Sequence, residues 1–167
     1  SPANLRDDEL GGVEGDPVHE VEAFEPFDGP AICVRIFLSI FDVHVQRAPL
    51  HGRVVRVDHR AGEHLNALKE QSADANEAVT IVMRHPTTRA MLCAVRQIAG
   101  TIARRIVCVT REGDILQRGQ RYGLIKFGST VELYLPVSEH IRVEVEPGRY
   151  VHGGQTVIAT ITGPLAD

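Results

Sequence analysis

The sequence predicts a mostly β protein with a barrel-like or sandwich-like architecture and short helices. Many short runs are rich in Val, Ile and Leu, and turn residues separate them at intervals of about ten residues. Aromatic residues make up only 5% of the chain and Trp is absent, so the core is expected to consist of Val, Ile, Leu and Ala. The length of 167 residues suits one domain with its own hydrophobic core.

The first 30 residues differ in composition from the rest of the chain. They are acidic and rich in Gly and Pro, as in the stretch "RDDELGGVEGDP", which favours a loop or a loosely held arm. From Ala31 onward, β-branched residues dominate. We therefore expect an N-terminal arm over residues 1–30 and a folded domain over residues 31–167.

The expected strands follow one another through the folded domain, with a hairpin around Pro86, Thr87 and Thr88. Two stretches favour short helices, Leu65–Ser72 and part of Gln97–Arg105. In chain order the strands are expected within AICVRIFLSI, HGRVVRVDHRAGEHL, AVTIVMRHP, RAMLCAVRQIAG, TIARRIVCVTREGD, RYGLIKFG, TVELYLP, IRVEVEPG and TVIATITG.

A weak internal repeat joins "EGDILQRGQRYGLI" and "PGRYVHGGQTVIAT". Gly113 and Gly119 of the first segment match Gly148 and Gly154 of the second, and a Gln and an apolar strand follow in both. Glycines at these spacings predict turns with positive φ. Such turns are typical of biotinyl/lipoyl-like folds and of folds with a duplicated hybrid motif.

Composition narrows the classes of function. The net charge of −4 and the pI of about 6.0 argue against a nucleic-acid binder, which is normally basic. Cys33, Cys93 and Cys108 form no CxxC pair, so neither a zinc knuckle nor a disulfide framework is indicated. Buried free thiols in a reducing compartment are expected instead.

The stretch "LIKFGSTVELYLP" contains a Gly-Ser pair between two expected strands. A Ser directly after a Gly can attack the Gly carbonyl in an N→O acyl shift, given a base and donors for the oxyanion. Gly128 has no side chain that could block the approach of the Ser129 hydroxyl. The commoner alternative is a turn in which Ser129 bonds its own backbone.

A second polar group lies in "FLSIFDVHVQRAP". Strand alternation would place Asp42, His44 and Gln46 on one face, where the carboxylate would raise the pKa of His44 and make it a general base. The alternative is a half-buried structural His. Arg104 and Arg105 could hold an anionic group such as phosphate, or could be structural. No histidines show metal-binding spacing, so no metal site is expected.

Taken together, these segments resemble the phosphatidylserine decarboxylase family, specifically its short, archaeal-type branch. The resemblance rests on the order and spacing of four motifs and covers roughly Ala31 to Ile161. The motifs are FLSIFDVHVQRAP, QIAGTIARRIVC, EGDILQRGQRYGLIKFGSTVELYLP and the closing glycine-rich strand that includes TVIA.

The resemblance implies a proenzyme that cleaves itself between Gly128 and Ser129. The family mechanism converts the Ser into a pyruvoyl group, which forms a Schiff base with the amine of phosphatidylserine and accepts electrons as CO₂ departs. The product is phosphatidylethanolamine. Ser129 would supply the pyruvoyl cofactor without an external cofactor or metal, the β chain would end at Gly128, and the α chain would begin at position 129.

The resemblance also assigns roles to other residues. His44 matches the assisting His of the family's D-x-H motif, and Arg47 stands where many members carry a second His. Asn4 stands where the family usually has the Asp of Ser-Pro-Ala-Asp-Gly, which orients the processing His. An amide cannot stabilise an imidazolium as a carboxylate does, so slow or blocked cleavage is expected. An engineered trap, a natural variant and an absent matching segment are three open explanations of Asn4.

The expected partners follow from the same family. Phosphatidylserine would be the substrate, with Arg104, Arg105 and Thr130 as substrate-binding candidates. We expect peripheral contact at the cytoplasmic face of a membrane in a prokaryote, no nucleic acid, and a homodimer or self-associated α and β chains.

Three interpretations that assign the chain a different function stay open at this point. A biotinyl/lipoyl-like carrier would need a modified Lys, but Lys126 lacks the usual flanking residues. A sugar-phosphotransferase subunit would need two suitable histidines, and only His44 qualifies. A family member that has lost activity and serves as a scaffold or binding domain is supported mainly by Asn4.

Overall fold

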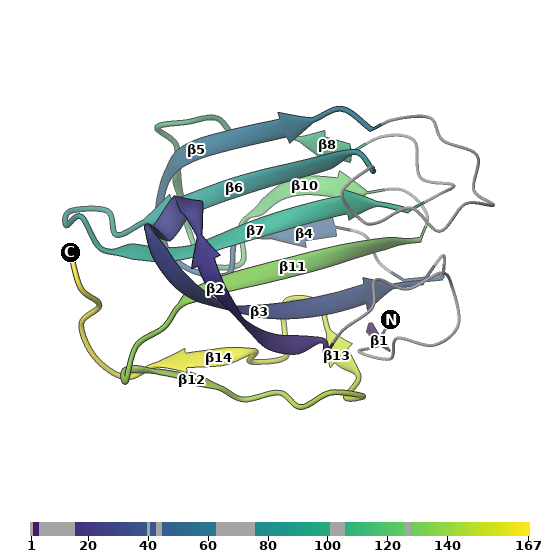
Figure 1. Cartoon of the computed structure of the whole chain (residues 1–167). Helices are drawn as coiled ribbons and strands as arrows, with labels where there is room; N and C mark the ends of the chain where they lie inside the picture. The colour runs from purple at the N-terminus through teal and green to yellow at the C-terminus, as the bar shows by residue number, and fades with distance from the viewer. Residues whose placement is uncertain are drawn as a thin grey trace.

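The computed structural model describes residues 2–3, 16–39, 41–42, 45–62, 76–100, 106–125 and 128–167. Its main element is an antiparallel seven-stranded sheet (Figure 1). The sheet is open, with β2 and β9 at its edges, so the sandwich-like expectation is confirmed and a closed barrel is not formed by the described strands. In spatial order its strands are β2 (Val18–Phe24), β3 (Gly29–Leu38), β11 (Ser129–Pro136), β7 (Met91–Ala99), β6 (Ala78–Arg84), β5 (Gly52–Arg60) and β9 (Ile115–Leu116).

Smaller sheets accompany the large one. The strands β4 (Val45–Arg47), β10 (Arg121–Ile125) and β8 (Ile106–Cys108) form a three-stranded antiparallel sheet. Two further pairs are β12 (Ile141–Val143) with β14 (Ala159–Ile161), and β1 (Pro2–Ala3) with β13 (Val151–His152). No helix among the described residues is long and apolar enough to cross a bilayer.

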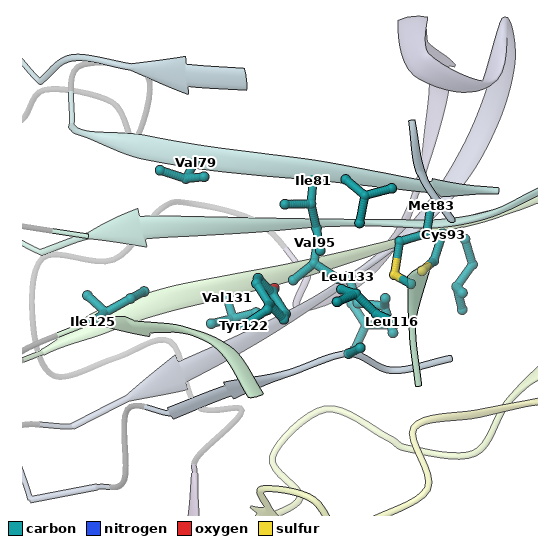
Figure 2. Packing of buried hydrophobic residues seen from close by; sticks show 14 of the residues in the cluster. Val79, Ile81, Met83, Cys93, Val95, Leu116, Tyr122, Ile125, Val131 and Leu133 are labelled. Atoms are coloured by element: carbon teal, nitrogen blue, oxygen red, sulfur yellow. The ribbon is translucent and has the colours of Figure 1, made fainter. Parts of the chain in front are cut away.

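The main core lies between the large sheet and the layer that contains β10. Alternation along β11 turns Val131 and Leu133 toward this core, where they join Tyr122 and Ile125 of β10. Figure 2 shows these side chains gathered with Ile81 and others from β6 and β7. The core consists mainly of Val, Ile, Leu and Ala, as the composition predicts.

A second, smaller core covers the opposite face of the large sheet. There Phe24 stacks on Tyr134, with ring centroids 4.2 Å apart, and packs edge-on against Phe27 of the short 3₁₀ helix η1 (Glu25–Phe27). The expectation of a loose arm is therefore wrong for Val18–Phe24, which pairs with β3 as an edge strand (Figure 1). Its charged, outward side chains hide the apolar contacts in the sequence.

Two other expectations have mixed outcomes. The hairpin around Thr87 is confirmed, because β6 and β7 pair along their length. The expected helix within Gln97–Arg105 is wrong for Gln97–Ala99, which belong to β7 and are held between β6 and β11. Pairing on both sides overrides the weak local helical preference. Leu65–Ser72 and residues 101–105 lie outside the described residues, so a helix there stays a prediction.

The repeated glycines occupy turns with positive φ, as predicted. The φ angles of Gly113, Gly119, Gly148 and Gly154 are 96°, 83°, 83° and 75°. Residues with a side chain rarely adopt this region of φ. The thiols of Cys33 and Cys93 are buried and free, and Cys108 is half-buried and free. Burial is the main cause that raises the pKa of both Cys33 and Cys93 to about 12.

Candidate functional site

Ser129 begins the strand that lies between β3 and β7. Its register partners are Leu38, the last residue of β3, and Ala99, the last residue of β7. Ser129 shares the inward face of β11 with Val131, and it is only 2% exposed. The Gly-Ser pair that the sequence singles out therefore lies where two strands end and a third begins.

The peptide bond before Ser129 is approached closely by Gly100. The backbone N–H of Gly100 donates a hydrogen bond to the carbonyl oxygen of Gly128, with an N···O distance of 3.1 Å. A Cβ at position 100 would overlap that oxygen, so the approach requires a glycine. Gly100 does not stand out in the sequence, because a close backbone contact leaves no signal there except the glycine itself.

Thr130 lies on the opposite face of the strand. It pairs with Phe37 and Ile98 and is half-buried, so alternation turns its side chain away from the face that carries Ser129. The structure does not bring these two hydroxyl-bearing side chains together.

Several candidate residues lie outside the described residues. Asn4, His44, Arg104, Arg105 and Lys126 all fall there. The roles of Asn4 and His44 in cleavage and of Arg104 and Arg105 in substrate binding stay predictions. The carrier interpretation of Lys126 is not tested either.

Asp42 belongs to a turn rather than to a strand. Its carboxylate accepts a hydrogen bond from the backbone N–H of Ser39 at 2.7 Å, and its own N–H donates to the carbonyl oxygen of Ser39 at 3.1 Å. The expected strand alternation is therefore wrong for Asp42, because β4 begins only at Val45. This turn presents Phe41, whose side chain is strongly exposed at 84%.

Arg47 is occupied in a contact with the repeated turns. Its guanidinium donates a hydrogen bond to the carbonyl oxygen of Gly119 at 3.0 Å, and its side chain runs close past Gly154. Arg47 thus connects two equivalent turns of the repeat.

A row of polar residues crosses the outer face of the large sheet. Thr80, Arg96, Glu132 and Arg35 are register partners on four neighbouring strands. The carboxylate of Glu132 accepts hydrogen bonds from Arg35 Nε at 3.1 Å and from the hydroxyl of Tyr134 at 2.5 Å. Arg96 Nη1 lies 3.6 Å from the same carboxylate. This row helps to fix the register of β11, and hence the position of Ser129.

Gln97 is an unusual polar residue inside the main core. It is 0% exposed, and neither its Oε1 nor its Nε2 has a hydrogen-bond partner in the described part of the chain. Its amide lies against Gly123 of β10. Gln97 pairs with Val131, two residues along from Ser129, so the amide belongs to the same inward face.

The described residues contain no group of three or more His, Cys, Asp or Glu side chains that could hold a metal ion. What the arrangement offers is a buried serine hydroxyl, an adjacent glycine carbonyl and a backbone donor on that carbonyl. These are parts that an intramolecular acyl shift uses.

Comparison with known proteins agrees with the motifs. The sequence profile described as "Phosphatidylserine decarboxylase" matches residues 5–159. Three similar proteins are each named phosphatidylserine decarboxylase proenzyme. The one from Carboxydothermus hydrogenoformans is 47% identical over 146 residues, covering 87% of this chain and 67% of the relative. The one from Saccharopolyspora erythraea is 44% identical over 154 residues, covering 89% and 64%.

The third relative, from Rhodopirellula baltica, is 43% identical over 147 residues, covering 88% of this chain and 61% of its own length. The chain thus spans about three-fifths to two-thirds of the length of these relatives. No solved structure matches. The extent of the profile match and the identities show that the chain belongs to the phosphatidylserine decarboxylase family.

Proposed function

We propose that this chain is the self-processing core of a pyruvoyl-dependent decarboxylase, which cleaves itself between Gly128 and Ser129 and acts on phosphatidylserine. The observation that carries the proposal is the position of Ser129, buried at the start of β11 beside a glycine carbonyl that is already hydrogen-bonded. The names of the relatives support the substrate.

The cleavage follows from the atoms at this bond. The Oγ of Ser129 attacks the carbonyl carbon of Gly128, the C–N bond breaks, and an ester with a free Ser129 amine results. Loss of the Cα proton of Ser129 and cleavage of its Cβ–Oγ bond release the Gly128 carboxylate and leave a dehydroalanine. Tautomerisation and addition of one water then release ammonia and leave a pyruvoyl group at position 129.

Burial of Ser129 favours elimination over hydrolysis of the ester. Because the residue is 2% exposed, bulk water has little access to an ester formed at its Oγ. Hydrolysis would return an ordinary amino-terminal Ser, whereas elimination leads to the pyruvoyl group.

His44 is the proposed base for the serine hydroxyl. The connection that contains it is anchored near the cleavage bond at both ends, because Leu38 pairs with Ser129 and Val45 pairs with Leu124. Leu124 in turn precedes Gly128 by four positions. These anchors support the assignment of His44 without the strand alternation that the sequence suggested.

The two products of cleavage are expected to stay together. The proposed α chain begins with β11, which lies between β3 and β7 of the proposed β chain and pairs with both. Val131 and Leu133 also pack into the shared core. The hydrogen bonds and apolar contacts of β11 do not depend on the peptide bond that is lost.

The pyruvoyl group would supply an electrophilic carbonyl that binds the substrate amine and takes up the electron pair when CO₂ leaves. The chain's own contribution is to hold position 129 at the end of a paired strand. Arg104 and Arg105 are proposed to bind the lipid phosphate, because a guanidinium can donate two hydrogen bonds to its oxygens.

Peripheral membrane contact is proposed through the turn that contains Phe41. Its ring is 84% exposed, and the turn directly follows the end of β3, where Leu38 pairs with Ser129. The free energy falls when an exposed aromatic side chain enters the apolar edge of a bilayer. This position would bring the lipid headgroup to the end of the sheet that carries Ser129.

A second candidate function is a family member that does not process itself and acts as a scaffold. It rests on Asn4, which stands where the family usually has the processing Asp. Activity assays on Asn4→Asp protein separate the two. The proposal predicts CO₂ release from short-chain phosphatidylserine, loss of that release in Ser129→Ala, and retention in the matched control Ser138→Ala. Asn4→Asp protein that stays uncleaved and releases no CO₂ would support the scaffold and contradict the enzyme.

A further inference from the structure

We infer that the backbone N–H of Gly100 is the oxyanion donor for self-cleavage, an inference that rests on the proposed function of the Gly128–Ser129 bond. The acyl shift places negative charge on the carbonyl oxygen of Gly128 when the Ser129 hydroxyl adds to the carbonyl carbon. Gly100 already donates to that oxygen before any reaction takes place.

The distance and the rigidity of the donor suit this role. The N···O separation to the carbonyl oxygen of the intact peptide bond is 3.1 Å, so only a small movement of that oxygen is needed to keep the hydrogen bond as charge develops. The neighbouring N–H of Ala99 is bonded elsewhere, to the carbonyl oxygen of Glu77 at 2.9 Å, whereas the N–H of Gly100 already points at the Gly128 oxygen. The donor therefore needs little reorganisation as charge develops.

The glycine separates this contact from an ordinary hydrogen bond between strands. Most ladder positions accept any side chain, but a Cβ at position 100 would overlap the carbonyl oxygen of Gly128. The missing side chain leaves room for this oxygen to move as its carbon becomes tetrahedral. Burial around Ser129 keeps the local dielectric low and strengthens the bond to the developing charge.

The same N–H serves the second step of the cleavage. When the Cβ–Oγ bond of Ser129 breaks, the electron pair goes to the leaving carboxylate of Gly128. One oxygen of that carboxylate is the former carbonyl oxygen, which Gly100 already contacts. A donor to this oxygen makes the carboxylate a better leaving group, so Gly100 assists both the acyl shift and the elimination.

An amide-to-ester replacement at Gly100 removes the N–H without changing any side chain and tests the inference directly. Cys93 and Cys108 bracket the residue, so a synthetic segment 93–107 can be joined by ligation at these two cysteines. The matched control is an amide-to-ester replacement at Ala99, which removes the neighbouring hydrogen bond to Glu77. Both proteins carry Asn4→Asp, and cleavage is followed by gel electrophoresis and intact mass.

We expect the Gly100 replacement to slow cleavage by about 10²–10³-fold, the usual effect of losing one oxyanion donor. The Ala99 replacement should stay within a few-fold of the unreplaced protein. Equal rates for the two replacements would overturn the role of Gly100 while leaving the proposed function standing. Failure of the unreplaced Asn4→Asp protein to cleave would overturn both.

A measurement without catalysis guards against a variant that fails to fold. In Ser129→Ala protein, NMR should detect a scalar coupling through the hydrogen bond from the Gly100 nitrogen to the Gly128 carbonyl carbon. In cleaved protein, the Gly100 amide shift should follow the titration of the new Gly128 carboxylate. Absence of both signals from folded protein would overturn the inference.

Discussion

Replacement of Glu132 by Gln should destabilise the fold strongly, although the two side chains have almost the same shape. Glu132 is 4% exposed, and its carboxylate contacts Arg35, Arg96 and Tyr134. The amide keeps one acceptor oxygen but removes the negative charge, which leaves two guanidinium groups without their counter-charge. Arg35 is the more deeply buried of the two and loses most.

The size of the effect follows from these contacts. Removing one partner of a buried ion pair costs about 3–5 kcal/mol. The lower end applies here, because Arg96 is partly exposed and can regain water, and because the substituted amide can still accept one hydrogen bond. With a urea m-value of about 2 kcal/mol/M, a loss of about 3 kcal/mol lowers the unfolding midpoint by roughly 1.5 M.

Urea unfolding followed by circular dichroism measures this shift. All proteins should carry Ser129→Ala, so that every chain is an uncleavable precursor with the same covalent state. Glu139→Gln is the matched control, because this carboxylate is 89% exposed and should change the stability by less than about 0.5 kcal/mol. A midpoint for Glu132→Gln that equals that of Glu139→Gln would refute the assigned role of the polar row.

Three further predictions concern stability and thiol chemistry, the first two in the same uncleavable precursor. Gly154→Ala should lower the free energy of unfolding by about 1–2 kcal/mol, because an alanine is strained at the φ of 75° that Gly154 adopts. The control is Gly153→Ala, which should change the stability little, because a Cβ at position 153 meets open space. Equal effects would contradict the turn geometry. Gln97→Leu should raise the stability by about 1 kcal/mol, because the buried amide of Gln97 has no hydrogen-bond partner in the described part of the chain. Calorimetry should show this as a Tm increase of about 2–4 °C. A lower Tm would show that the amide does have hydrogen-bond partners. At pH 8, iodoacetamide should label half-buried Cys108 before Cys93, because burial raises the pKa of Cys93 to about 12 and keeps it protonated. Since the ordinary pKa of the thiol is 9.0, its contribution to stability is complete below pH 9 and is lost progressively as the pH rises toward 12, so unfolding should become easier over that range. Early labelling of Cys93 would contradict its burial.

The strands and turns of the domain could largely be predicted because their signals are local. β-branched runs mark β3, β5, β6 and β7, and glycines at regular spacing mark the turns with positive φ. β2 could not be recognised, because an edge strand with charged outward residues does not look like a buried strand. Its apolar contact, the stacking of Phe24 on Tyr134, joins residues far apart in the sequence.

The candidate site divides in the same way. Gly128 and Ser129 are adjacent in the chain, so a motif can identify them. Gly100 could not be assigned from the sequence, because its contact depends on the register between β7 and β11. The position of Asp42 could not be predicted either, because a turn that uses its carboxylate interrupts the expected alternation.

Intact mass under denaturing conditions shows whether the Gly128–Ser129 bond cleaves itself to make a pyruvoyl group. Unaltered and Asn4→Asp protein should be compared during long incubation at neutral pH. We predict that Asn4→Asp protein divides into two fragments, the smaller beginning at position 129 and lighter by one ammonia than a peptide with an amino-terminal Ser129. The unaltered chain should cleave far more slowly, by up to about 10⁴-fold if its amide acts as in a serine-protease triad. Asn4→Asp protein that stays whole, breaks elsewhere, or yields an ordinary amino-terminal Ser129 would contradict pyruvoyl formation at this bond.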